Sequence, residues 1–195
     1  MRMFCRRLIP AFVAVAVLAG GMPARAAGGG LFEMFSTLCL DHVLDADGVK
    51  AEALSQGFAA SDRELHDGPR KLEAFEKASP DATLVLAVNA TVRDSLGPIP
   101  QANAVTCGVY GSSRDAEAMD QAARWAGVAV DPDHSTDEVD YYLFTEINGV
   151  RAPLAKATDQ QLIDGLTKGR VWMLAVGRDP DAPSVMLTVL RATGR

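Results

Sequence analysis

Hydrophobic positions recur along this chain with two periods, at every second residue in some segments and at every third or fourth residue in others. Residues 104–110 alternate as a strand does, and residues 113–126 carry an apolar stripe at helical spacing. Ser112, with Asp115 three positions later, predicts a capping box at the start of that helix, and Gly127 predicts its end. We therefore expect this stretch to form a strand, a tight turn and an amphipathic helix in unbroken order.

Helical spacing also predicts helices earlier in the chain. Residues 31–44 form an amphipathic pattern, and a shorter pattern at residues 49–56 ends at Gly57. Pro69 is suited to the first turn of a further helix that runs to Ala78, with apolar side chains at every third position. The sequence thus predicts three helices between residues 31 and 78.

Strand-like runs dominate the rest of the chain. The apolar run at residues 83–92 is too short for a helix between its flanking turns and indicates a buried strand. An Asn-Gly pair at residues 148–149, between two runs rich in β-formers, is the strongest short signal for a hairpin. Thr158 predicts the N-cap of a short helix, and residues 171–176 and 184–190 predict a second hairpin.

These elements together predict an α+β fold. We expect N-terminal helices followed by a mostly antiparallel sheet of five or six strands, with one long helix at residues 113–126 packed on it. The chain lacks the regular alternation of strands and helices that a doubly wound parallel sheet requires.

The N-terminus has the pattern of a secretory signal peptide at residues 1–26. Arginines precede an apolar run at residues 8–18, and Ala24-Arg-Ala26 offers small residues for cleavage before Ala27. A retained membrane anchor is the weaker alternative, because the apolar run is shorter than the roughly 20 residues that span a bilayer. We expect residues 27–195 to form a single α+β domain that is periplasmic or secreted.

Composition narrows the classes of partner. The leader holds four of the 19 basic residues and none of the 25 acidic ones, so the chain from residue 27 has a formal net charge of −10. Such a charge argues against binding to nucleic acid or to anionic membranes. No second apolar span follows the leader, so we expect no membrane span in the mature chain.

Two cysteines remain after cleavage, Cys39 and Cys107. Each lies on an apolar face, and the exported chain enters an oxidising compartment, so we expect a disulfide between them. The alternative is two buried free thiols that act as small core residues.

The most polar loop is at residues 131–140, with five carboxylates and one imidazole. Asp131, Asp133, His134 and Asp137 are the candidates there for a hard-cation site. The spacing matches no recognised pattern of ligands, so a solvated loop before a strand is the favoured interpretation.

No catalytic set is assembled in the sequence. A Gly-x-Ser-x-Gly elbow is absent, and the histidines after the leader, at positions 42, 66 and 134, stand in unrelated contexts. The sequence therefore favours an exported, bacterial-type envelope protein without cofactor, a non-catalytic domain that binds an unidentified protein or small molecule. The alternative is a metal-assisted enzyme that uses the loop at residues 131–140 with His134.

Overall fold

The computed structural model describes residues 30–67, 70–78, 83–112, 115–179 and 181–193, and in this part of the chain it contains four α-helices, one π-helical turn and nine strands. The helical elements are α1 (Leu31–Phe35), η1 (Ser36–Leu40), α2 (Ala46–Ser55), α3 (Ala116–Ala126) and α4 (Asp159–Lys168). The strands are β1 (Ala59–Ala60), β2 (Leu65–Asp67), β3 (Arg70–Ala78), β4 (Thr83–Arg93), β5 (Ala102–Tyr110), β6 (Val139–Ile147), β7 (Val150–Pro153), β8 (Arg170–Gly177) and β9 (Ser184–Ala192).

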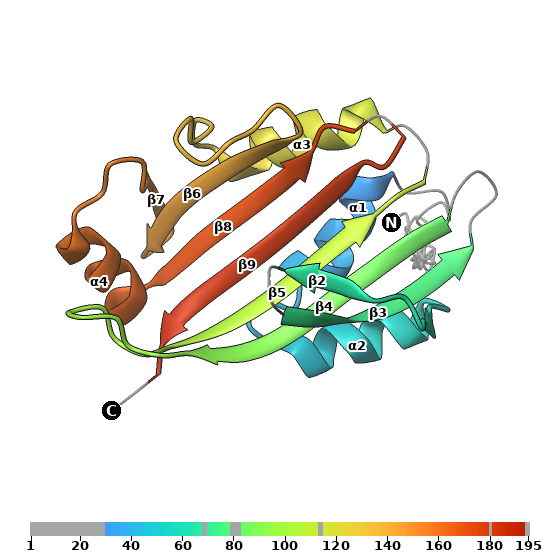
Figure 1. The fold of residues 1–195 in the computed structure, drawn as a ribbon, viewed down its shortest axis with the longest axis horizontal. Coiled ribbons are helices and arrows are strands. Elements are labelled where there is room, and N and C mark those ends of the chain that lie inside the picture. The colour runs from blue at the N-terminus through green and yellow to red at the C-terminus, as the bar shows by residue number, and fades with distance from the viewer. Residues whose placement is uncertain (1–29, 68–69, 79–82, 113–114, 180, 194–195) are drawn as a thin grey trace, which may run out of the picture.

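The strands form one antiparallel sheet in the order β1-β3-β4-β5-β9-β8-β6-β7, and β2 pairs with β3 beside β1 (Figure 1). The expected α+β class is thus confirmed. Both expected hairpins are present as β6 with β7 and β8 with β9. The expected count of five or six strands was too low. The expectation of one long helix was also wrong, because α2 and α4 are nearly as long as α3.

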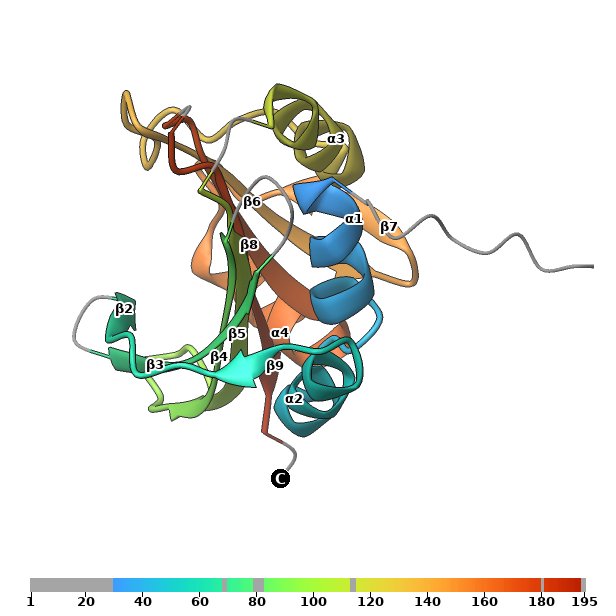
Figure 2. The ribbon, with the colours of Figure 1, turned by 90° about the vertical axis from the view of Figure 1, so that its right-hand side faces the viewer.

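Three helices cover one face of the sheet. Figure 2 shows α1, α2 and α3 on the same side, while the sheet curls toward the other side at its β3 end, where β2 lies. The main core lies between these helices and alternate residues of the strands, among them Leu86, Cys107, Phe144, Leu174 and Leu187. Alternate side chains of each strand therefore point into this core, as expected for a sheet with one buried face.

A disulfide joins Cys39 of η1 to Cys107 of β5, and the Cα atoms of the two residues are 5.6 Å apart. The pair expected from the sequence is thus at disulfide distance, and both side chains are buried in the main core. The bond ties the N-terminal helical segment to a central strand. Such a bond is compatible with an oxidising, extracytoplasmic location.

α4 packs on the opposite face of the sheet, at one end. Its Leu162 and Leu166 contact Val171 and Leu190, which alternate with main-core residues along β8 and β9. Gly165 allows this close approach, because a Cβ atom there would lie 2.4 Å from the Thr145 side chain. The capping box predicted at Thr158 is present.

The helix expected from Pro69 to Ala78 was wrong, although Pro69 itself lies outside the described residues. Residues 70–78 form β3, in which Phe75 pairs with Leu86 of β4. Glutamate, lysine and alanine favour helix in isolation, but pairing with β4 on one edge and with β1 and β2 on the other overrides that preference.

Two helix termini also differ from expectation. The segment expected to be one helix at residues 31–44 ends its helical part at Leu40, after a change from α to π geometry. The N-cap of α3 is Asp115, whose carboxylate accepts from the Ala118 N–H, whereas the Ser112 hydroxyl accepts from the Thr83 N–H. The predicted capping box was therefore wrong, because Ser112 is used to join β4 to the turn after β5.

The expected signal peptide lies outside the described residues. Among the helices of the described part, none is long and apolar enough to cross a membrane.

Candidate functional site

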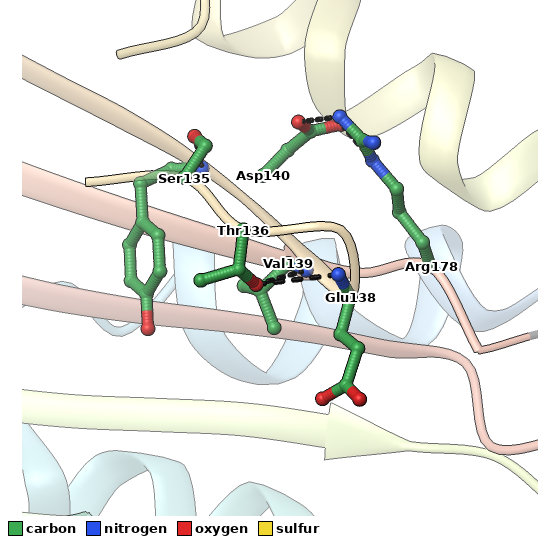
Figure 3. A network of polar contacts seen from close by, with 7 residues as sticks. Ser135, Thr136, Glu138, Val139, Asp140 and Arg178 are labelled. Carbon is green, nitrogen blue, oxygen red and sulfur yellow. Dashed lines mark hydrogen bonds and ion pairs between the residues drawn. The ribbon is translucent and has the colours of Figure 1, made fainter. Parts of the chain in front are cut away.

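The polar loop before β6 covers the free edge of that strand. β7 pairs only with the second half of β6, so the backbone of the first half needs other partners. The Asp131 N–H donates to the Tyr141 carbonyl (2.7 Å), and the Tyr141 N–H donates to the Ser135 hydroxyl (2.9 Å). The Thr136 N–H donates to the Val139 carbonyl (2.9 Å), and the Thr136 hydroxyl accepts from the N–H groups of Glu138 and Val139 (Figure 3). This loop therefore closes the sheet edge.

The four candidate ligands in that loop have separate surroundings. Asp131 is 2% exposed, and its carboxylate accepts from the Asp133 N–H (3.0 Å) and lies 3.1 Å from His134 Nδ1. The side chains of Asp133 and Asp137 are exposed. In the described part of the chain, no three His, Cys, Asp or Glu side chains lie where they could share a metal ion. Asp131 serves to order the turn, and His134 lies against it.

Asp140, the last acid of the loop, is bound by Arg178 from the end of β8. The Arg178 Nε donates to one carboxylate oxygen at 2.8 Å, and Nη2 pairs with the other (Figure 3). The hydrogen bond and the negative charge of Asp140 raise the pKa of Arg178 above its ordinary value. Both bonded nitrogens of the Arg178 guanidinium are therefore engaged by Asp140.

The opposite edge of the sheet is covered as well. β1 pairs with β3 at Phe75 and Glu76, and β2 pairs with β3 at residues 70–72. The segment between β1 and β2 bulges away and leaves a hollow of about 510 Å³, which is lined in part by Leu72, Ala74 and Asn89. The edge strands β1, β2 and β7 have only two, three and four residues, and such short edges are poor templates for an added strand.

The remaining large surface is the face of the sheet away from α1, α2 and α3, which we call the open face. It is formed by alternate residues of β4, β5, β9, β8 and β6, beyond the area that α4 covers. Its partly exposed side chains include Asn89, Thr91, Tyr110, Val139, Tyr141, Leu143, Met173, Ser184 and Met186. Among the positions of these five strands on this face, only Arg93, at the far end of β4, is charged.

Small side chains lie between the larger ones on the open face. Ala87 pairs with Gly108, which pairs with Met186 of β9. A Cβ atom at Gly108 would lie 3.0 Å from the Met186 side chain, so glycine lets this methionine lie flat against β5. The hydroxyl of Tyr110 lies 3.5 Å from the Met186 sulfur. The face therefore combines shallow areas with polarizable side chains that adapt to what they contact.

A buried polar pair lies at the centre of the open face. Thr106 and Thr188 pair across β5 and β9, their hydroxyls are 2.9 Å apart, and they are 5% and 1% exposed. Each hydroxyl thus has a partner within the sheet. The face offers apolar contact and neutral hydrogen-bonding groups, which suit binding better than general acid–base catalysis.

The sequence did not single out the residues of this face. Residues 104, 106, 108 and 110 alternate with the core positions of β5 and are all uncharged, as are Met186 and Thr188 in β9. That absence of charge on the second face of adjacent strands is the signal that could have indicated the site.

Comparisons of this chain with protein-family models, with curated proteins and with solved structures found no match.

Proposed function

We propose that this chain is an exported, non-catalytic binding protein of the cell envelope, and that it holds an apolar ligand or partner segment on the open face. The supporting observation is the uncharged, partly exposed surface of five strands in a chain whose formal net charge after the leader is −10. Covering such a surface releases about 25 cal/mol for each Å² of apolar area removed from water.

Two observations support the envelope as the compartment. The sequence begins with an arginine-flanked apolar segment that ends in Ala24-Arg-Ala26. The pair Cys39 and Cys107 forms a disulfide, a bond that persists in oxidising compartments.

The methionines give a direct test of the binding face. Of the four methionines after the leader, Met173 and Met186 lie on the open face, whereas Met34 and Met119 pack on the helix side. In protein labelled with [methyl-13C]methionine, we expect the neutral apolar dye Nile red to shift the resonances of Met173 and Met186. The other two methyl resonances serve as internal controls, and shifts confined to them would contradict the proposal.

A charge placed on the open face should abolish this binding. We expect Met173→Glu to weaken Nile red binding about tenfold or more, because the dye would have to desolvate a carboxylate. Met173→Leu should bind as the original chain does. Leu54→Glu is the matched control, since Leu54 is exposed, apolar and on the helix side. Circular dichroism of each variant shows whether it has folded, and equal binding by folded Met173→Glu would refute the assignment.

A further inference from the structure

One end of the open face carries a group of acidic side chains, which we call the acidic rim: Asp137, Glu138, Asp179 and Asp181. All four are exposed. They flank the start of β6 and the turn from β8 to β9, where the Arg178 N–H donates to the Glu138 carbonyl (2.7 Å). The adjoining row of the open face is Tyr110, Ser184, Gly177 and Val139, as the strand register gives it. The rim therefore borders the uncharged surface directly.

In the described part of the chain, none of the four rim carboxylates forms an ion pair. Among the described residues, Arg178 is the basic side chain beside them. Its guanidinium binds Asp140, and the more distant charge of Asp137 adds a smaller effect that raises the pKa of Arg178. Elsewhere several acids are paired, as in Glu73 with Lys50 and Glu146 with Arg151. Four unpaired negative charges next to an apolar surface attract a partner that is both apolar and positively charged.

We propose that the occupant of the open face is a basic amphipathic segment of a partner protein, whose apolar side lies on the open face and whose lysines or arginines reach the acidic rim. This inference rests on the proposed function and specifies the chemistry of the partner. A neutral small ligand gains nothing from the rim. A second copy of this chain would bring like charges together, and an added strand would find only the short edge strands β1, β2 and β7 to pair with.

Model peptides of about four helical turns test the proposal by calorimetry. The first has leucine at helical spacing with lysine elsewhere, the second replaces lysine by glutamate, and the third contains lysine without leucine. We expect the first alone to bind, with an affinity that falls as salt is added. Equal binding of the first and second peptides, or of the first and third, would overturn the proposal.

Variants separate the rim from the general charge of the protein. Asp137→Asn/Glu138→Gln should weaken binding of the first peptide about tenfold, since it removes two favourable ion pairs at the rim. The control Asp41→Asn/Asp47→Asn removes two exposed charges on the helix side and should leave the affinity unchanged. If the control weakens binding as much as the rim variant, the charge acts at a distance and the proposal fails.

Nile red distinguishes this inference from the proposed function. The rim variant should bind the dye as the original chain does, because it leaves the open face intact. Binding of the dye without binding of the basic amphipathic peptide contradicts the inference about the partner and leaves the proposed function standing. Failure of both contradicts both, and peptide-induced shifts of Met34 and Met119 in place of Met173 and Met186 place the partner on the wrong face.

Discussion

Single side chains connect segments that are far apart in the sequence, and Arg151 of β7 is the clearest case. Its guanidinium donates to the carbonyls of Trp125 and Ala126 at the end of α3, and it lies 4.4 Å from the centre of the Trp125 ring. Glu146, opposite it on β6, accepts from Nε at 3.0 Å. Arg151 thus satisfies free carbonyls at a helix C-terminus, where a positive charge is favourable, and fixes α3 to the β6–β7 hairpin.

Tyr142 gives a prediction at the residue scale. Burial raises the pKa of its phenol above the ordinary value of 10.0, and the negative charge of Asp140 adds to that effect, while Arg178 opposes it. Below about pH 10 both the folded and the unfolded chain keep the proton, so the contribution to stability is intact. Above that pH the unfolded chain loses the proton first, and the free energy of unfolding should fall.

The measurement is urea unfolding at a series of alkaline pH values. Tyr142→Phe has no proton to lose there, so its stability should decline less between about pH 10 and pH 11 than that of the original chain. Identical slopes for the two proteins would show that Tyr142 does not contribute.

At the scale of elements, the protection of the sheet edges explains segments that looked irregular in the sequence. The segments at residues 59–60 and 65–67 are too short to be predicted as strands, yet they pair with β3 as β1 and β2. The loop at residues 131–136 similarly binds the backbone of β6 without forming a strand of its own. Both devices hide backbone groups that otherwise promote edge-to-edge association.

The loop before β6 yields the prediction at this scale. Asp131→Ala removes the acceptor for the Asp133 N–H and the partner of His134, so the loop should detach from β6. We expect faster hydrogen exchange at the amides of Val139 and Tyr141, and a loss of about 1–2 kcal/mol in the free energy of unfolding.

Two controls frame that experiment. The amide of Tyr142, on the edge of β6 that pairs with β8, should exchange as before. Asp133→Ala changes an exposed carboxylate in the same loop and should leave the exchange of all three amides unaltered. Unchanged exchange in Asp131→Ala would show that the hydroxyls of Ser135 and Thr136 hold the edge without its help.

At the scale of the whole molecule, the two faces of the sheet differ in what covers them. α1, α2 and α3 bury one face, and α4 covers only one end of the other (Figures 1 and 2). The N-terminal helices contact β4, β5 and β9, and α1 also contacts α3, where the Asp115 carboxylate accepts from the Leu31 N–H at 2.7 Å. The bond from Cys39 to Cys107 adds a covalent link to β5.

The disulfide gives the prediction for the whole molecule. It joins residues separated by 68 positions, and the chain-entropy model gives about 4 kcal/mol for closing a loop of that length in the unfolded state. Treatment with dithiothreitol should therefore lower the free energy of unfolding in urea by about that amount. Cys39→Ala/Cys107→Ala should be insensitive to the reductant, and coincident unfolding curves of the treated and untreated original chain would contradict the prediction.

The sequence by itself determined the elements whose signals are local. Periodicity predicted strands β4 and β5, and turn geometry predicted the hairpin at Asn148-Gly149. Capping preferences predicted the start of α4 at Thr158 and the end of α3 at Gly127. Each of these signals acts within a few residues. The count of cysteines in the sequence predicted which two residues would pair. Only the tertiary structure shows that they lie within bonding distance.

Tertiary structure decided what depends on distant partners. Residues 70–78 became a strand because β4 offered an unpaired edge, and helix-forming residues accept strand geometry when that pairing supplies their backbone hydrogen bonds. The open face likewise exists only after five strands align their uncharged positions, and the acidic rim only after β6 and the turn from β8 to β9 meet. Local sequence fixes which side chains alternate, whereas the pairing of remote strands fixes which of them stay uncovered.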